Sequence, residues 1–344
     1  MKLLIITQKV HRADTGALGF FHSWIIEFAK HAKFVTVICL EEGKHELPDN
    51  VKVLSLGKEK SHSRIKYLKN FYTYIWRERK NYDVVFVHMN QEYVLLAGWW
   101  WRLVGKKVLL WRNHKNGTYL TNFAASFCNT VFCTSPASYT ARFKKTKIMP
   151  AGIDIKVYAE SSDAKRTPSS ILSLGRISVV KNIDVLVRAC ALLDSRGVDF
   201  SATIAGDTEL SQKEYHQKLL KSAESLIAKG EIVFKNGMTE SETAKAYKSY
   251  ELFVNLTSPG SLDKTILEAM LSGALVIVCN TYFRGILPDG LIFEEGNVDD
   301  LAHKIKTALS LPQAEKDRIA DSMKKYVIEN HSLEATINKI MENI

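Results

Sequence analysis

The segment SPGSLDKTILEAMLSG, residues 258–273, combines a turn, a helix start and one acidic side chain. Its Pro, Gly and Ser favour a turn, and Ser261 or Asp263 can cap the helix that follows. The unpaired N–H groups at the start of a helix, together with its dipole, form a natural anion-binding site. Glu268 lies farther along this helix, where such an acid is either solvated or binds polar groups of a ligand.

Two cations lie in the loop GRISVVKN, directly after the predicted strand ILSL. Arg176 and Lys181 together can neutralise a diphosphate, because Arg makes a forked contact and Lys acts as a point charge. The alternative is that both are solvated surface cations. Asp207 follows the predicted strand SATIAG, and Gly237 and Met238 follow EIVFKN, where each alone is typical of an ordinary turn.

Glycines and histidines follow the predicted strands of the first half. Gly16 and Gly19 form a GxxG loop that opens a helix, which is a weak signal by itself. His88 ends DVVFVHM, and His114 ends KVLLWRNH. A histidine at the carboxyl end of a strand is better placed to act on a ligand than one on an apolar face, although a structural role remains the alternative for each.

Short β-branched runs that alternate with helical patterns must position these residues. KLLIIT, FVTVICL, DVVFVHM, KVLLW and TVFCTS predict strands in the first half, and ILSLGR, SATIAG, EIVFKN, LFVNLT and ALVIVCN do so in the second. This alternation predicts an α/β protein with two doubly wound parallel sheets, which bind ligands beyond the carboxyl ends of their strands. Turn residues and charges over 149–168 indicate the boundary between an N-terminal domain, 1–155, and a C-terminal domain, 156–344.

Four segments of the second half resemble the nucleotide-sugar domain of the family 4 glycosyltransferases. GRISVVKN, IAGD, FKNGM and GSLDKTILEAMLSGALVIV occur in the family's order and spacing, and PAGID resembles its interdomain segment. DVVFVHMN and LLWRNHK resemble its two N-domain histidine motifs, so the resemblance covers nearly the whole chain. It implies a GT-B fold, with two Rossmann-like domains facing across a cleft and a last helix that crosses back to brace the N-domain. It also implies a retaining hexosyltransferase that uses a nucleotide-diphosphate sugar.

The resemblance further implies roles for individual residues. Arg176 and Lys181 would bind the donor diphosphate and stabilise the departing nucleotide, and His114 would meet the donor sugar near the reacting carbon. The remaining donor-binding residues would be Gly16, Met238, Leu262, Asp263, Lys264 and Glu268, with Glu268 on the ribose hydroxyls and Met238 near the base. Gly19 and His88 would lie on the acceptor side. No cofactor or obligatory metal is expected, because the sequence contains no DxD pair and the two cations can serve the diphosphate.

One position departs from the family pattern. The family usually carries a second glutamate eight residues before Glu268, and this chain has Gly260 there. Asp263 could supply the missing carboxylate, or Ser261 a hydroxyl, or the donor could present a different hydroxyl pattern. A further alternative is a catalytically weak or inactive relative that only binds a nucleotide sugar.

The charge of the chain is concentrated in its first part. Residues 1–150 hold 24 Lys and Arg against 10 Asp and Glu, a net charge of +14, whereas the remainder has a net charge of −4. All six tryptophans also lie in the first part. This asymmetry indicates an anionic partner, but no nucleic-acid-binding module is present, and we expect no nucleic acid.

The segment SHSRIKYLKNFYTYIWRERK, residues 61–80, predicts an amphipathic helix. Its apolar stripe contains Ile65, Leu68, Tyr72, Ile75 and Trp76, and its neighbouring cations are Lys66, Lys69, Arg77 and Lys80. The helix either packs on its own sheet with a basic outer face or lies on an anionic membrane surface. The second alternative would suit a lipid-linked acceptor, with a polysaccharide acceptor as the other expectation.

Cysteine usage and hydropathy predict a location. The five cysteines form no CxxC pair, and neither a secretory leader nor a run long enough to span a membrane is visible. We therefore expect a cytoplasmic protein, peripheral on the inner face of a membrane if the acceptor is a lipid.

Overall fold

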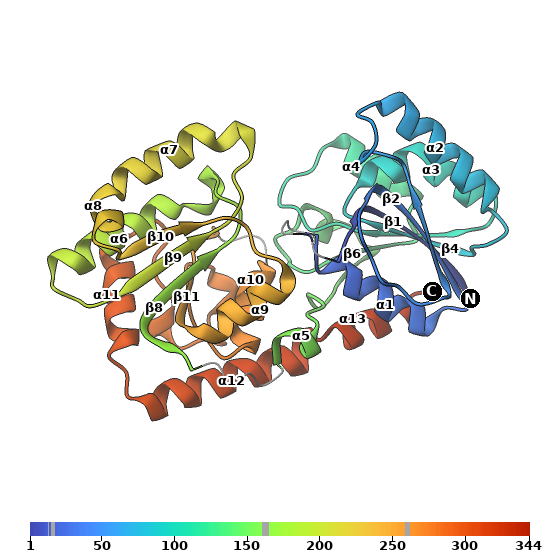
Figure 1. The fold of residues 1–344 in the computed structure, drawn as a ribbon. Helices are drawn as coiled ribbons and strands as arrows, with labels where there is room; N and C mark the ends of the chain where they lie inside the picture. Colours follow the sequence, from blue (N-terminus) through green and yellow to red (C-terminus); the bar gives the residue numbers. More distant parts are fainter. Residues whose placement is uncertain (13, 15–17, 160–164, 259–261) are drawn as a thin grey trace. The chain divides into compact units, whose positions relative to one another are not determined.

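The computed structural model describes residues 1–12, 14, 18–159, 165–258 and 262–344. The chain forms two compact units (Figure 1). Met1–Asp14, Leu18–Gly152 and Leu333–Ile344 belong to unit 1, and Ile153–Ser332 form unit 2. Over the described ranges, no helix has both the length and the apolar character needed to cross a membrane.

Unit 1 is built on a seven-stranded parallel sheet. Its strands, in spatial order, are β3 (Val51–Ser55), β2 (Phe34–Glu42), β1 (Lys2–Val10), β4 (Val84–His88), β5 (Lys107–Trp111), β6 (Thr130–Cys133) and β7 (Thr146–Ile148). The sequence pattern predicts the five inner strands and omits β3 and β7, which are the two edges.

Alternate residues of each inner strand enter two separate cores. Leu3 and Ile5 of β1 belong to one core, and Leu4 and Ile6 belong to the other. Successive side chains of a strand point to opposite faces, so a central strand that is covered on both faces consists of an unbroken apolar run. This explains why the inner strands are visible in the sequence.

Helices cover both faces of the unit 1 sheet (Figure 1). One face is covered by α1 (Phe21–His31) and by α13 (Leu333–Met341), the last helix of the chain. The other is covered by α2 (Arg64–Arg77), α3 (Gln91–Leu103) and α4 (Tyr119–Phe127), and a short 3-10 turn spans Tyr139–Arg142. Leu333, Ile337 and Ile340 of α13 pack into the same core as α1. The C-terminal helix therefore braces the N-terminal unit, as predicted.

Unit 2 is built on a five-stranded parallel sheet. Its strands, in spatial order, are β10 (Ile232–Lys235), β9 (Ser201–Ala205), β8 (Thr167–Leu174), β11 (Tyr250–Asn255) and β12 (Leu275–Val278). All five are predicted from the sequence. The two parallel sheets with their helices confirm the doubly wound α/β fold.

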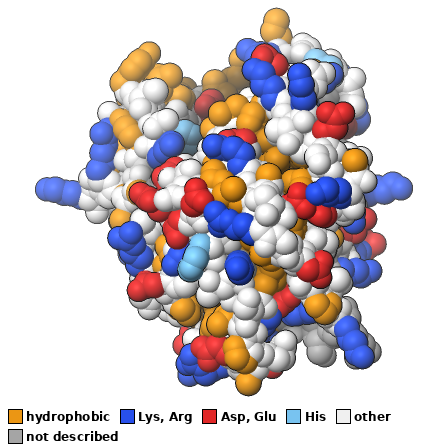
Figure 2. Space-filling model, turned by 90° about the vertical axis from the view of Figure 1, so that its left-hand side faces the viewer, with side chains coloured by type: hydrophobic (Ala, Val, Ile, Leu, Met, Phe, Trp, Pro, Cys, Tyr) orange, Lys and Arg blue, Asp and Glu red, His pale blue; other side chains and the backbone are white. Residues whose placement is uncertain are grey.

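The helices of unit 2 lie between and after these strands. They are α5 (Ile155–Ala159), α6 (Ile183–Ser195), α7 (Lys213–Ser222), α8 (Glu224–Ala228), α9 (Glu240–Ser249), α10 (Lys264–Leu271), α11 (Val298–Leu309) and α12 (Gln313–His331). Four 3-10 turns span Val179–Lys181, Leu210–Gln212, Thr281–Phe283 and Asp289–Leu291. On the side of the molecule shown in Figure 2, cationic and anionic side chains are interspersed. This mixture matches the small net charge of the second half.

The strand orders place a topological switch point in each sheet. In unit 2 the chain adds β9 and β10 on one side of β8 and then places β11 on the other side. In unit 1 it adds β2 and β3 on one side of β1 and β4 on the other. Ligands of open parallel sheets bind beyond the carboxyl ends of the strands at such a point, so the candidate sites lie after β8 and β11 and after β1 and β4.

Candidate functional site

The switch point of unit 2 carries a small cavity. The loops after β8 and β11 line it, and they bring together Arg176, Lys181 and Thr257. The sequence placed these two cations in one loop, and the structure shows that they border the same space. The cavity therefore presents two cations at the position where a parallel sheet binds its ligand.

Asp263 holds Lys181 in place. The Lys181 ammonium lies 2.6 Å from Oδ2 of Asp263 and donates a second hydrogen bond, 3.0 Å long, to Oγ1 of Thr257. These oxygens are its hydrogen-bond partners among the described residues, so one of its three N–H donors is left for a ligand.

The Asp263 carboxylate is occupied on both oxygens. Oδ2 also accepts from Asn255 Nδ2 at 3.1 Å and from Thr257 Oγ1 at 2.9 Å, while Oδ1 accepts from the N–H and hydroxyl of Thr265. Asp263 is thus the N-cap of α10. Burial acts to raise its pKa, but Lys181 and the hydrogen-bond donors outweigh burial and lower it. The carboxylate stays ionised and is engaged by protein groups, a geometry that favours a positioning role over contact with a sugar.

Arg176 reaches outward from the same cavity. Its side chain is 56% exposed, and Nη1 lies 2.6 Å from Oε1 of Glu209, which follows β9. Sequence reasoning missed Glu209, because an acid in a polar loop carries no pattern that points to a partner. The pair is exposed and therefore weak, so an anionic ligand can compete for the guanidinium.

Close backbone contacts fix the loop that carries Arg176. The N–H of Gly175 donates to Ala205 O at 3.0 Å, and a Cβ on Gly206 would lie only 1.8 Å from the Gly175 carbonyl oxygen. Asp207 continues the link, since its Oδ1 accepts from the N–H of Gly237 at 2.8 Å. The ends of β8, β9 and β10 are thereby tied together. Half-buried Met238 follows at the end of this chain of contacts.

A buried titratable cluster lies along α10. Glu268 is buried, and its Oε2 accepts a hydrogen bond of 3.4 Å from the hydroxyl of Tyr247. Burial raises the pKa of Glu268, while Lys264 acts in the opposite direction. Burial lowers the pKa of Lys264 in turn. Desolvation thus disfavours the charged form of both groups.

Glu240, in the first turn of α9, belongs to the same cluster. Its pKa is raised by burial, and its Oε1 is buried without a hydrogen-bond partner among the described residues. Sequence reasoning missed Glu240 and Tyr247. The capping box of Thr239 and Glu242 that starts α9 could have located Glu240 at a helix start, but not beside α10.

The predicted residues of unit 1 lie in different surroundings. His88 is 1% exposed, stacks on Phe21 with ring centroids 4.0 Å apart, and has Nδ1 3.4 Å from Oγ1 of Thr7. Gly19 is buried in the turn before α1, where a Cβ would lie 2.9 Å from the carbonyl oxygen of Asp14. His114 is exposed, and its Nδ1 lies 2.9 Å from the carbonyl oxygen of Asn116.

The remaining predicted residues divide into two groups. Leu262 is half-buried directly before the N-cap of α10. Gly16, Gly260 and Ser261 lie outside the described residues. Within the described ranges, no group of three His, Cys, Asp or Glu side chains is arranged to hold a metal ion.

Two protein-family models match the chain. Residues 154–330 match the family described as glycosyl transferases group 1, and residues 13–112 match the one described as glycosyl transferase 4-like. Alpha-monoglucosyldiacylglycerol synthase of Streptococcus pneumoniae is 26% identical over 197 residues. That match covers 55% of this chain and 42% of the synthase, so the chain matches less than half of that relative's length.

Solved structures share the fold at low sequence identity. Anabaena Alr3699/HepE, crystallised with UDP and glucose, has a TM-score of 0.79 and 16% identity over all of both chains. Sucrose-phosphate synthase of Thermosynechococcus elongatus has a TM-score of 0.79 and 14% identity, covering 99% of this chain and 98% of its own.

Proposed function

The chain belongs to the glycosyl transferases group 1 family, and we propose that it transfers a sugar from a nucleotide-diphosphate donor to a lipid-linked or polysaccharide acceptor with retention of anomeric configuration. The observation that carries this proposal is the pair of cations, Arg176 and Lys181, on one cavity at the switch point of unit 2. HepE has been solved with UDP-glucose, which supports a UDP-sugar as the first donor to test.

The leaving group explains the need for these cations. In the transfer, the bond between the anomeric carbon and the diphosphate breaks and its electron pair leaves with the nucleoside diphosphate. An acceptor hydroxyl forms the new glycosidic bond, and its proton passes to the departing phosphate. Arg176 and the available N–H of Lys181 stabilise the charge that develops on the diphosphate, which lowers the barrier. When the donor binds, Arg176 leaves its ion pair with Glu209 and contacts the diphosphate of the donor.

The start of α10 completes the donor site. Backbone N–H groups at Leu262, Asp263 and Lys264 cradle the distal phosphate, supported by the positive end of the helix dipole. Asp263 does not repel the phosphate strongly, because Lys181 lies 2.6 Å from its carboxylate. Glu268 binds the ribose hydroxyls, and Met238 lies against the base.

Unit 1 supplies the remaining groups in this proposal. His114 is exposed, as a ligand-contacting residue must be. Gly19 and His88 support the acceptor side, with buried His88 acting through its neighbours. The unit then works as the acceptor-binding domain.

Exposed apolar side chains on unit 1 support a membrane-bound acceptor. The stripe predicted on α2 is largely uncovered: Ile65 is 82% exposed and Trp76 59%, while Ile75 is buried. Leu103 of α3 and Tyr119 of α4 are 77% and 78% exposed. A helix packed only on its own sheet would bury this stripe, so the exposure favours a membrane surface. The protein then acts as a peripheral enzyme on an anionic leaflet.

A nucleotide-sugar panel tests the proposal. UDP-, GDP- and ADP-sugars are incubated with the protein and with anionic vesicles that carry the candidate acceptor, and released nucleoside diphosphate and glycosylated product are measured together. We expect acceptor-dependent release from one donor class. Binding of a nucleotide sugar without turnover on any acceptor would support the alternative of an inactive relative, which Gly260 motivates.

A further inference from the structure

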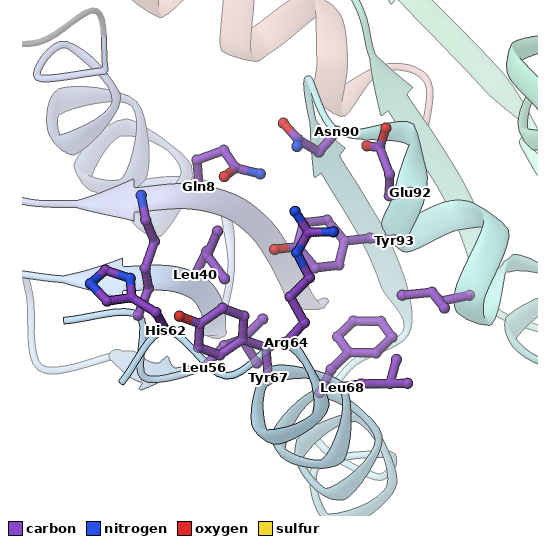
Figure 3. A pocket seen from close by; sticks show the side chains of 13 residues that line it. Gln8, Leu40, Leu56, His62, Arg64, Tyr67, Leu68, Asn90, Glu92 and Tyr93 are labelled. Carbon is purple, nitrogen blue, oxygen red and sulfur yellow. The ribbon is translucent and has the colours of Figure 1, made fainter. Parts of the chain in front are cut away.

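A cavity of about 630 Å³ lies at the switch point of unit 1. It is lined from the ends of β1 and β2, from the segment after β3, from α2 and from the start of α3 (Figure 3). Small-molecule sites commonly have volumes of about 300–1,000 Å³. The cavity therefore has the size and the place of a ligand site, and it is separate from the donor cavity of unit 2.

One side of the cavity carries amide and carboxylate side chains, and the opposite side carries apolar side chains together with His62 (Figure 3). In Figure 3, Gln8, Asn90 and Glu92 lie along one side, and Leu56, Tyr67 and Leu68 lie along the other. Arg64 extends from the start of α2 toward the polar side. A ligand that fills this space needs hydroxyl or amide groups at one end and hydrocarbon at the other.

The polar groups on this cavity have unused hydrogen-bonding capacity. Among the described residues, the side chains of Gln8, Asn90, Glu92, His62 and Arg64 make no hydrogen bond or ion pair. The nearby cation Lys58 is engaged by Glu41 at 3.2 Å. Arg64 is therefore the arginine or lysine of this lining that has no carboxylate partner among the described residues.

The backbone presents Asn90 to this cavity through an uncommon turn. The backbone angle φ of Met89 is 68°, and the N–H of Asn90 donates to the carbonyl oxygen of His88 at 2.9 Å. This is the pattern of a γ-turn with a positive central φ, which is rare and costs free energy. The turn connects β4 to α3, so it determines where Asn90 and Glu92 lie.

The apolar side of the cavity continues onto the surface of α2. Leu68 lines the cavity and is also 42% exposed, and Ile65 and Tyr72 flank it on the same helical face. The Tyr72 hydroxyl donates to Leu96 O at 3.1 Å, and Leu96 lines the cavity as well. The exposed apolar side chains of α2 therefore adjoin the apolar lining of the cavity.

We propose that this cavity binds the acceptor as an anionic amphiphile, a glycerophospholipid-like molecule with hydroxyl groups on its head. Arg64 and His62 take the phosphate, Gln8, Asn90 and Glu92 take the hydroxyls, and the leucines take the hydrocarbon. The inference rests on the proposed function, because it names the class of acceptor for that reaction. It does not depend on general attraction to a membrane surface.

Short-chain lipids test the cavity without a bilayer. Dihexanoylphosphatidylglycerol, kept below its aggregation concentration, is titrated into the full-length protein by calorimetry, beside dihexanoylglycerol and glycerol 1-phosphate. We expect the phospholipid to bind more tightly than either fragment. Arg64→Gln should weaken phospholipid binding roughly tenfold or more and leave dihexanoylglycerol unchanged, because it removes a charged hydrogen bond. Leu68→Asp should weaken binding of both lipids.

Matched variants separate the possible failures. Arg102→Gln removes an exposed charge from α3 away from the cavity and should leave every affinity unchanged. UDP affinity, measured on each variant, should not move. The inference would be overturned if the wild-type protein did not bind the phospholipid, or if Arg64→Gln and Leu68→Asp bound it as tightly as the wild type. UDP binding and turnover on another acceptor would in that case leave the proposed function standing. Lipid binding without UDP binding would instead contradict the proposed function.

Discussion

The ammonium of Lys181 lies 2.6 Å from the carboxylate of Asp263, which also caps α10. One acid therefore positions both a cation and the helix start of the proposed donor site. Asp263→Ala should weaken UDP and UDP-sugar binding by the same factor, because it disturbs the phosphate side of the site. It should also lower the free energy of unfolding by about 0.5–2 kcal/mol, the usual range for a cap. Calorimetry with both ligands checks this, and selective loss of the sugar nucleotide would place Asp263 on the sugar.

Removal of either diphosphate cation should slow transfer. Arg176→Ala and Lys181→Ala should each raise the barrier by about 2.7–4 kcal/mol, as expected when one group that stabilises developing charge is lost. Arg176→Ala should keep the wild-type Tm because the side chain is exposed, whereas Lys181→Ala should lower it by leaving Asp263 without its cation. Steady-state kinetics and thermal unfolding measure these effects. Arg188→Ala, an exposed cation on α6, is the control, and wild-type turnover in both test variants would refute the donor site.

The contact between Gly206 and Gly175 predicts a steric effect. A Cβ on Gly206 would lie 1.8 Å from the Gly175 carbonyl oxygen, so Gly206→Ala must displace the loop that carries Arg176. We expect a loss of about 1–3 kcal/mol in unfolding free energy, typical of overpacking, together with weaker UDP binding. Gly290→Ala is the matched control, because nothing lies within 4 Å of a Cβ there. Equal stability of the two variants in urea unfolding would contradict this packing.

The buried carboxyl of Glu268 predicts a pH-dependent stability. Its folded pKa is raised above the ordinary value near 4.3, so its contribution is present below that value and is lost as pH rises toward the folded pKa. Each unit of elevation corresponds to about 1.4 kcal/mol. Lys264, whose pKa is lowered, acts with the opposite sign at higher pH.

Comparison of variants isolates this contribution. As the pH rises from 5 to 7, the unfolding free energy of Glu268→Gln should increase relative to that of the wild type, because the variant has no carboxyl to ionise. Urea unfolding at several pH values measures the difference. Glu329→Gln, an exposed acid on α12, should show no such trend. A constant difference for Glu268→Gln would mean that the carboxyl is ordinarily solvated.

The basic surface of α2 predicts binding to anionic vesicles. Lys66 and Lys69 of α2 and Lys80, in the turn after it, are exposed, and each should contribute about 1 kcal/mol at an anionic surface. Arg77 is less suitable for this test, because it lies 3.2 Å from buried Glu78. The triple Gln variant should sediment less with anionic vesicles, added salt should act likewise, and neutral vesicles should bind little. Lys213, Lys221 and Lys245 to Gln in unit 2 is the control, and equal loss there would indicate only a net-charge effect.

The sequence predicts the inner strands well because their physical signal is strong. Strands buried on both faces, such as β4, consist of unbroken apolar runs. The edges β3 and β7 are short and partly exposed, and Lys52 and Lys147 interrupt them, so their pairing depends on a neighbouring strand that the local pattern does not contain.

The candidate site is predictable in part for the same reason. Lys181 and Asp263 follow strands and precede helices, where parallel sheets bind ligands, so position alone suggests them. Glu209 and Glu240 depend on which loops meet in space. The sequence also leaves the exposure of Ile65 and Trp76 open, because an amphipathic stripe has the same pattern whether a sheet or a membrane covers it.

The return of α13 to unit 1 has a consequence for how the chain acquires its structure during synthesis. Leu333, Ile337 and Ile340 fill the core beside α1, yet the ribosome makes them only after all of Ile153–Ser332. Part of one face of the N-terminal sheet therefore stays uncovered while the second unit is translated and folds. The first unit can therefore complete its core only after the second unit has been translated.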